Sequence, residues 1–393
     1  MPAPSKRLDA IPPYLFAEIS RIKAEKIASG ADVIDLGIGD PDQPTPQPII
    51  RALQRAADDP RTHSYDESPR GWKPFLEAAA KWYGREYGVS LDPATQMLEV
   101  IGSKEGLAHI VWAFCDPGDV VLVPDPGYPV YRVHAKMAGA TIHSMPLLEE
   151  NGFLPNLADI PSEVAKRAKM MFVCYPCNPT GAVATAGFFE DAVRFCREYD
   201  ILLVSDMAYA QVVYDGYKAP AALQVEGSRE HVVEFHSLSK PFNMTGWRIG
   251  FACGSPSAVG TLGRFKDNID SKQFPAVAEA AGFALLEGDN SATMDLYKKR
   301  RDALVGGLNS AGWKVQPPKA TFYVWARVPT GETSADFAKR LLEEASVLVI
   351  PGTGYGENGE GYVRMSLTVR GDVAGERLAE AARRMAEVAL GRV

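Results

Sequence analysis

The chain has 393 residues, of which 46 % are hydrophobic and 23 % are charged, as in an ordinary globular protein. The net charge of -7 offers no basic surface for nucleic acid, no run is long and apolar enough to span a membrane, and residues 1–7 lack the apolar core of a signal peptide. We therefore expect a cytoplasmic protein of two domains, since one core rarely serves a chain of this length.

The first hundred residues predict helices, a strand and one glycine-rich loop. An amphipathic run over residues 8–29 predicts an N-terminal helix, and Val33–Leu36 predicts a short strand. Residues 37–46 are rich in glycine and proline, which indicates a loop whose backbone can approach a ligand or link two domains. Apolar residues between Trp72 and Trp82 recur with helical spacing.

A strand that ends at Ile101 leads through Gly102 and Ser103 into a second helical pattern that reaches Phe114. Free backbone N–H groups at the start of such a helix suit a phosphate. A serine is also a common helix cap, so this signal alone leaves both interpretations open.

The middle of the chain alternates strands and helices, such as the helical stretch Phe188–Tyr199. Its strand-like runs are apolar throughout, as expected for strands covered on both faces. This pattern predicts an α/β domain with a largely parallel sheet. The runs are Val120–Val123, Met170–Tyr175, Ile201–Ser205, Val232–Phe235 and Ile249–Cys253.

Beyond Asp289 the pattern changes to a mixture of helices and shorter strands. We therefore predict a large domain over residues 45–290 and a smaller α+β domain over 291–393, which the N-terminal segment 1–44 joins. The expected elements are helices at Met294–Leu308, Ala335–Ala345 and Val373–Leu390, and strands at Thr321–Trp325, Val347–Ile350 and Tyr362–Leu367.

Lys240 lies in a polar stretch between two of the apolar runs, Val232–Phe235 and Ile249–Cys253. Burial there disfavours the charged ammonium, and the neutral amine is the form that condenses with a carbonyl. Nearby serines and Arg248 are good ligands for an anion. A carbonyl-reactive lysine beside a phosphate site points to pyridoxal 5'-phosphate (PLP), which carries both groups.

Other polar side chains follow the carboxyl ends of the predicted parallel strands, where α/β sheets bind ligands. Tyr128 follows the run that ends at Val123, and Asn178 follows the run that ends at Tyr175. Asp206 and Tyr209 both follow the run that begins at Ile201. Each alone has an ordinary interpretation as a turn residue, a cap or a core aromatic. Their common edge predicts that they converge on one ligand.

Three other patterns carry little weight. Cys174 and Cys177 form a C-x-x-C that ends a strand and has no second pair, so we expect reduced thiols. The histidines show no H-x-x-x-H spacing, and we predict no metal site. Residues 354–359 fit G-x-G-x-x-G, but a strand rather than a helix follows, so we expect a loop beside a site and no dinucleotide.

The stretch from Ser237 to Gly250 reads S-L-S-K-P-F-N-M-T-G-W-R-I-G, which resembles the cofactor-lysine signature of the class I aminotransferases, PLP enzymes of fold type I. Nearly the whole chain is similar to this family. The resemblance implies a fold type I PLP-transferase, with Lys240 as the residue that bonds the cofactor and moves the substrate proton. It also implies a homodimer with shared sites, because Tyr65 matches a tyrosine that reaches the neighbouring subunit's phosphate.

The resemblance implies a role for each matching residue. The ring nitrogen pairs with Asp206, the ring hydroxyl with Asn178 and Tyr209, and the ring face with Tyr128. The phosphate ligands match Ser103, Lys104, Ser237, Ser239 and Arg248. The substrate α-carboxylate is held by Arg364 and by the backbone of Gly39, and Asn178 also matches a substrate contact.

Within the family, the motifs L-G-I-G-D-P-D at 36–42 and N-I-D-S at 268–271 are most similar to the LL-diaminopimelate aminotransferases of lysine biosynthesis. In these enzymes Tyr14 and Asn268 match contacts to the substrate, and Asn268 comes from the other subunit. The resemblance implies ping-pong transfer from LL-diaminopimelate to 2-oxoglutarate.

Cys177, Lys272 and the run from His63 to Pro69 depart from the usual pattern, and the last two lie where a substrate's far end could be read. An aminotransferase for alanine, aspartate or another small amino acid is therefore the alternative. A PLP lyase or synthase is a third reading. We do not expect a PLP-binding regulator, because the match begins near Leu8 and leaves no room for a DNA-binding domain.

Overall fold

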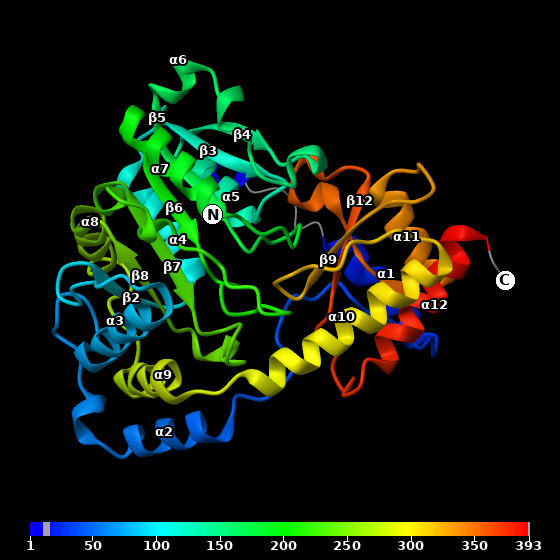
Figure 1. Cartoon of the computed structure of the whole chain (residues 1–393), viewed down its shortest axis with the longest axis horizontal. Coiled ribbons are helices and arrows are strands. Elements are labelled where there is room, and N and C mark those ends of the chain that lie inside the picture. The colour runs from blue at the N-terminus through cyan, green and yellow to red at the C-terminus, as the bar shows by residue number, and fades with distance from the viewer. Residues whose placement is uncertain (11–15, 392–393) are drawn as a thin grey trace.

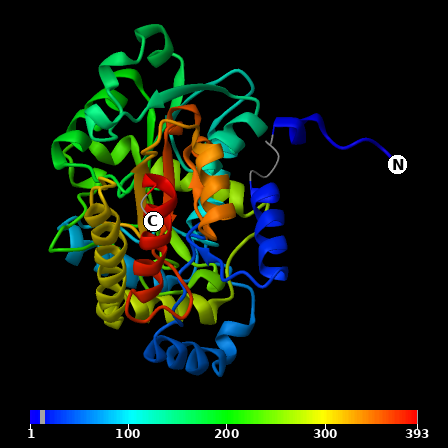
Figure 2. The ribbon, with the colours of Figure 1, turned by 90° about the vertical axis from the view of Figure 1, so that its right-hand side faces the viewer.

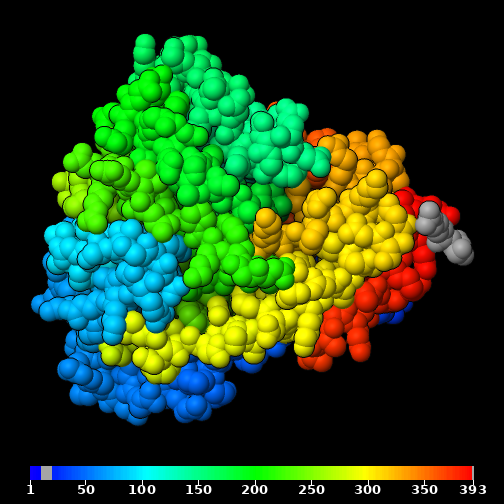
Figure 3. Space-filling view, viewed as in Figure 1, coloured from blue at the N-terminus to red at the C-terminus, as the bar shows by residue number. Residues whose placement is uncertain are grey.

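The computed structural model describes residues 1–10 and 16–391. Two parts lie side by side, and the long helix α10 (Ser291–Ala311) runs from one into the other (Figure 1). In the space-filling view, α9 (Pro275–Glu287) and α10 form one band that joins the parts (Figure 3). In the turned view, the first residues extend away from the body (Figure 2).

A seven-stranded sheet, counted over the described residues, forms the larger part, and its strand order is β2-β8-β7-β6-β5-β3-β4. The five strands from β7 to β4 run parallel, which confirms the expected largely parallel α/β sheet. The strands are β2 (Met97–Val100), β3 (Val120–Asp125), β4 (Thr141–Pro146), β5 (Ala168–Cys174), β6 (Leu202–Asp206), β7 (Val232–Ser237) and β8 (Gly250–Gly254).

β8 differs from its parallel neighbours, because it pairs antiparallel with both β7 and β2. The segment between β7 and β8 is a loop with one short 3-10 helix, and a parallel return requires a longer crossover, usually a helix. β4 has no counterpart among the strands expected from the sequence. This edge strand is partly exposed and mixes polar with apolar residues, so it lacks the continuous apolar run of the central strands.

Helices cover both faces of the sheet, which explains the continuous apolar runs. In β3, Val120 and Leu122 pack into one core, while Val121 and Val123 pack into the other. The helices that line the first core include α3, α7 and α9, and those that line the second include α4, α5 and α8. The helices of this part, besides α9, are α2 (Gln47–Ala57), α3 (Lys73–Tyr87), α4 (Ser103–Phe114), α5 (Pro129–Met137), α6 (Ser162–Ala165), α7 (Ala186–Tyr199) and α8 (Pro256–Lys266).

The smaller part has a three-stranded antiparallel sheet, within the described chain, in the order β11-β12-β9. Its elements are β9 (Tyr323–Arg327), α11 (Ser334–Glu344), β10 (Val347–Leu348), β11 (Ile350–Pro351), β12 (Tyr362–Ser366) and α12 (Glu376–Leu390). The N-terminal β1 (Ile34–Asp35) pairs in parallel with β10. The domain boundaries at residues 44 and 290 stay a prediction.

The N-terminal helix is shorter than expected. Residues Phe16–Ala28 form α1, and Lys6–Ala10 form the separate 3-10 helix η1. The other 3-10 helices are η2 (Pro60–His63), η3 (Glu149–Asn151), η4 (Leu157–Asp159), η5 (Ala222–Gln224), η6 (Ser228–Glu230), η7 (Thr245–Trp247), η8 (Gly352–Tyr355) and η9 (Glu357–Gly359). Among the described helices, none is long and apolar enough to cross a membrane.

A buried arginine fixes the glycine-rich loop to the smaller part. Arg300 of α10 is fully buried and forks onto both carboxylate oxygens of Asp42, at 2.7 and 2.8 Å. It also donates to the carbonyls of Leu367, Val369 and Asp372. These bonds satisfy the charge in the interior and tie residues 40–42 to the chain beyond β12.

A buried carboxylate joins two loops at the sheet edge. Glu99 of β2 accepts the N–H of Trp72 at 2.8 Å and the N–H of Gln273 at 3.1 Å. The Gln273 side chain in turn donates to the carbonyls of Trp247 and Arg248. Burial raises the pKa of Glu99 to about 7. Glu99 therefore fixes the loops that follow Tyr65 and Asn268.

Candidate active site

Lys240 lies just beyond the end of β7, on the wall of a cavity of about 810 Å³ between the two parts. Its Nζ donates to the carbonyl of Gly39 at 3.2 Å and lies 5.5 Å from the ring centre of Phe322. Burial lowers the pKa of Lys240 to about 8, while the carboxylate of Asp40 opposes this shift. The neutral amine predicted from the apolar surroundings is therefore accessible near neutral pH.

An anion site borders the same cavity. Helix α4 begins at Ser103, and no side chain caps its start, so its first N–H groups face the cavity lined by Ser103 and Lys104. Arg248 adopts the left-handed conformation with φ 56° and its guanidinium lies against Gly102, where a Cβ would overlap Nη2. Ser237 and Ser239 line the same wall, and all five predicted phosphate ligands therefore meet in one cavity.

Asp206 ends β6 and supplies a buried carboxylate to the cavity. Its Oδ2 accepts the Tyr131 hydroxyl at 2.6 Å, and its Oδ1 accepts the N–H of Ala208 at 3.1 Å. Burial nevertheless raises the pKa of Asp206. Tyr131 stacks on Phe172 with ring centres 4.7 Å apart, so the carboxylate is fixed in place. A rigid buried carboxylate is a good partner for a cationic ring nitrogen.

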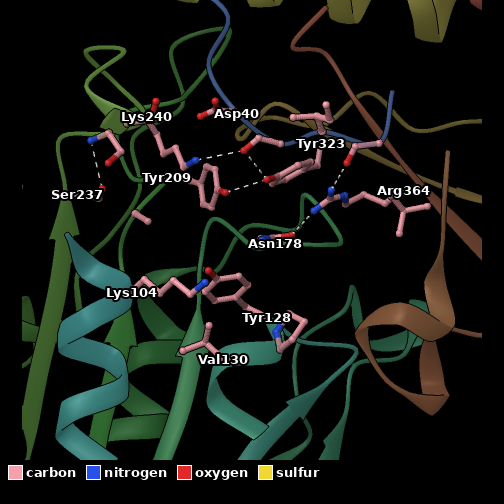
Figure 4. A pocket seen from close by; sticks show the side chains of 18 of the residues that line it. Asp40, Lys104, Tyr128, Val130, Asn178, Tyr209, Ser237, Lys240, Tyr323 and Arg364 are labelled. Atoms are coloured by element: carbon pink, nitrogen blue, oxygen red, sulfur yellow. Dashed lines mark hydrogen bonds between the residues drawn. The ribbon is translucent and has the colours of Figure 1, made fainter. Parts of the chain in front are cut away.

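Tyr128 lines the cavity at the start of α5, and its ring meets Tyr131 edge-on at 5.7 Å. In the close view, Lys104 and Tyr128 lie across the cavity from Lys240 and Tyr209 (Figure 4). Tyr128 would cover one face of a flat ligand in this cavity, the start of α4 would hold an anionic group, and Lys240 Nζ would be available to a carbonyl.

Arg364 of β12 enters the cavity from the smaller part and is 5 % exposed. It donates to Asn178 Oδ1 at 3.0 Å and to the carbonyl of Gly37 at 2.8 Å. Its guanidinium lies between the rings of Tyr323 and Tyr355, with Cζ 4.1 and 4.9 Å from their centres. The buried Nε has no hydrogen-bond partner in the described part of the chain. This is a rigid guanidinium that suits a carboxylate.

Three predicted site residues are not placed in the cavity by this chain. Tyr65 is 93 % exposed, and Asn268 is exposed and donates to the carbonyl of Arg264 at 2.9 Å. Tyr14 lies outside the described residues. By contrast Gly39, Asn178 and Tyr209 all line the cavity as predicted.

Several residues of this site were not expected from the sequence. Tyr323 and Tyr355 flank Arg364, Asp40 lies beside Lys240, and Tyr131 holds Asp206. Tyr355 lies in the G-x-G-x-x-G segment, which forms η8 and η9 and then leads into β12. This confirms the expectation of a loop beside a site. The sequence predicted a strand around Tyr323 but gave no signal that its side chain belongs to the site.

The cysteines are buried free thiols, and Cys174 Sγ donates to the carbonyl of Pro176 at 3.6 Å. Among the described residues, Glu234, His236 and Cys253 come close enough to share an ion, which no sequence spacing indicated. Glu234 already accepts bonds from Tyr83 and from the N–H of Leu223. Glu234 and His236 thus belong to a buried hydrogen-bond network on β7, beside Cys253 of β8.

Comparisons with known proteins agree with this geometry. The family model "Aminotransferase class I and II" matches residues 31–381. An LL-diaminopimelate aminotransferase of Moorella thermoacetica is 51 % identical over 392 residues, covering 99 % of each chain. Substrate-bound BacF from Bacillus subtilis has a TM-score of 0.92 and 38 % identity, covering 98 % of each chain. An aspartate aminotransferase double mutant from Thermus thermophilus has a TM-score of 0.90 and 30 % identity, covering 99 % of this chain and 100 % of the other.

Proposed function

Because this chain belongs to the class I and II aminotransferase family, we propose that it transfers the amino group of LL-diaminopimelate to 2-oxoglutarate with PLP as cofactor. The observation that carries transamination is the convergence of Lys240, Asp206 and Arg364 on one cavity. The substrate assignment is supported by relatives of that printed name, which are about half identical to this chain over nearly its full length.

The residues of the cavity fit PLP. The start of α4 with Arg248 and the two serines would hold its phosphate, and Asp206 would pair with the ring nitrogen. Asn178 and Tyr209 would bind the ring hydroxyl, and Tyr128 would cover the ring. The absence of a side chain at Gly102 lets the Arg248 guanidinium lie beside the start of α4, a position that a Cβ at residue 102 would overlap. When bound, PLP supplies an aldehyde that bonds amines and a ring that withdraws electrons.

The chain's own residues supply binding and proton transfer. Arg364 binds the α-carboxylate of either substrate with two parallel hydrogen bonds, and its aromatic neighbours keep the guanidinium plane fixed. Lys240, with a pKa of about 8, has a neutral Nζ that can take the proton from the substrate Cα and return it.

We infer a homodimer that completes the site. Tyr65 and Asn268 are exposed on loops that Glu99 ties together, and Ile269 and Phe274 are exposed beside them. This exposure supports a neighbouring subunit that receives Tyr65 at its phosphate and Asn268 at its substrate. Tyr14 remains a predicted substrate contact, and the cytoplasmic location remains a prediction from the sequence.

An aminotransferase for aspartate or another small amino acid is the second candidate. The structural likeness to the Thermus thermophilus aspartate enzyme supports it, but that identity is 30 %, against 51 % for the relative from Moorella thermoacetica. Cys177 and Lys272, which differ from the usual residues of LL-diaminopimelate aminotransferases, do not distinguish the two candidate functions. Cys177 is buried, and Lys272 pairs with Asp267 at 2.9 Å.

A panel of amino donors with 2-oxoglutarate tests the proposal. We expect glutamate to form fastest from LL-diaminopimelate and much more slowly from alanine, aspartate and meso-diaminopimelate. Glutamate formed from alanine or aspartate alone would exclude the substrate assignment. Lys240→Ala should abolish both turnover and the visible absorbance of bound cofactor, whereas Lys136→Ala, at an exposed lysine of α5, should preserve both.

A further inference from the structure

Tyr323, at the start of β9, joins the two halves of the active site. Its ring lies under the Arg364 guanidinium, with Cζ 4.1 Å from the ring centre, and its hydroxyl lies 3.0 Å from the Tyr209 hydroxyl. Figure 4 shows it between Tyr209 and Arg364. It is 2 % exposed. One side chain therefore contacts the arginine for the substrate and the tyrosine for the cofactor.

The surroundings hold Tyr323 in one position. Its N–H donates to Thr321 Oγ1 at 3.0 Å, and its ring packs against those of Phe322 and Tyr209 at 4.9 and 5.5 Å. Gly39 lies directly against the hydroxyl, where a Cβ would overlap it. The ring cannot swing away without moving the glycine-rich loop or β12.

The residues around Tyr323 also determine where the hydroxyl protons of Tyr323 and Tyr209 point. The carbonyl of Gly39 is 3.5 Å from the Tyr323 hydroxyl and already accepts from Lys240 at 3.2 Å. Either hydroxyl can be the donor in the Tyr323–Tyr209 pair, and we assign the Tyr323 proton to it because the Tyr209 oxygen, at 3.0 Å, is closer than the Gly39 carbonyl, at 3.5 Å. Tyr209 then has its own proton free to donate into the cavity. A hydroxyl that accepts a hydrogen bond is a stronger donor in turn.

We propose that Tyr323 is a positioning residue that fixes the substrate arginine through its ring and strengthens Tyr209 as a hydrogen-bond donor through its hydroxyl. This rests on the proposed function, because it assigns Tyr209 to the cofactor's ring oxygen. A bond donated to an anionic oxygen lowers that oxygen's proton affinity. Tyr323 therefore influences the pH at which the bound cofactor changes its visible absorbance.

Two substitutions separate the ring from the hydroxyl. Tyr323→Phe keeps the ring, so we expect KM for the amino donor within about twofold of the wild type. Its kcat should fall about 2- to 10-fold, and the pH midpoint of the absorbance change should rise by about 0.5 unit. Tyr323→Leu also removes the ring, and KM should then rise about 3- to 20-fold. The Kd for glutarate, a dicarboxylate without an amino group, should rise by a similar factor.

Two further variants make the test specific. Tyr362→Phe, on β12, is the matched control, because Tyr362 also lies against an arginine and donates to Glu149 at 2.8 Å, outside the cavity. It should leave the midpoint unchanged. In a Tyr209→Phe background, Tyr323→Phe should move the midpoint no further, because the shift acts through Tyr209.

The proposal is overturned if Tyr323→Phe leaves the midpoint at the wild-type pH, or if it shifts the midpoint equally without Tyr209. It is also overturned if Tyr323→Leu binds glutarate as tightly as the wild type. Melting of the apoproteins identifies a variant that fails to fold, and the double variant then provides the decisive comparison. A wild-type protein without cofactor absorbance refutes the proposed function itself, and this inference with it.

Discussion

Replacing Arg364 with lysine should lower kcat/KM in both half-reactions, because both substrates carry the carboxylate that Arg364 would bind. The guanidinium uses Nη1 for Asn178 and Nη2 for the Gly37 carbonyl, yet keeps its buried Nε without a partner in the described residues. Lysine carries a single ammonium and cannot fork onto a carboxylate while it holds both neighbours. A hydrogen bond to a charged group contributes about 1.5 to 3 kcal/mol. We therefore expect kcat/KM to fall about 10- to 100-fold for both the amino donor and 2-oxoglutarate.

Steady-state kinetics of both substrates would measure this loss. Arg370→Lys is the matched control, since Arg370 is an exposed arginine six residues further along the chain and should retain full activity. The cofactor absorbance of Arg364→Lys should remain, because Arg364 does not line the phosphate end of the cavity. A fall of less than about threefold in a folded, cofactor-loaded variant contradicts the carboxylate role.

Three further outcomes follow from the geometry. Gly102→Ala should weaken PLP binding about tenfold or more by fluorescence titration, because its Cβ overlaps Arg248; Gly88→Ala has a similar positive φ with open space around it and should bind PLP normally. Asp206→Asn should lower the single-turnover rate about 100-fold or more, because the amide cannot balance a cationic ring nitrogen; a fall below about fivefold refutes that pairing. The Glu99 carboxyl has a folded pKa of about 7, above its ordinary 4.5, so ionising it opposes folding, and wild-type stability is lost as pH rises through this range. Glu99→Gln should gain about 3 kcal/mol relative to wild type between pH 4 and pH 8 in urea unfolding, and a pH-independent difference contradicts the assignment.

Residues with strong local signals could be predicted from the sequence. The apolar runs located five strands of the large sheet, because burial on both faces leaves few polar positions in them, here Ser205 and Glu234. Lys240, Asp206 and Asn178 follow such strands, and the parallel arrangement brings them to one edge. The resemblance added Arg364, which lies far along the chain in the other part.

Residues whose role depends on tertiary contacts were not predictable in this way. Tyr323 belongs to an alternating strand in which every second residue is expected in the core, so its hydroxyl gave no separate signal. The antiparallel direction of β8 depends on the length of a loop, and Tyr131 of helix α5 acquires its role from Asp206 at the end of β6. For both tyrosines the contact joins segments that are far apart in the sequence, and no local sequence pattern indicates it.

The Arg300–Asp42 pair has a consequence for motion. Residues 36–42 are bound to the smaller part at several points, since Ser366 N–H donates to the Leu36 carbonyl, Thr368 to Ile38, and Arg364 to Gly37. Lys240 belongs to the large sheet and reaches across to Gly39. Arg364 and residues 36–42 are therefore fixed to one another within the smaller part. A hinge motion between the two parts would change the distance from Arg364 to Lys240 Nζ while Arg364 and residues 36–42 keep their arrangement. A bound amino acid would then be brought to Lys240 by a rotation of the smaller part.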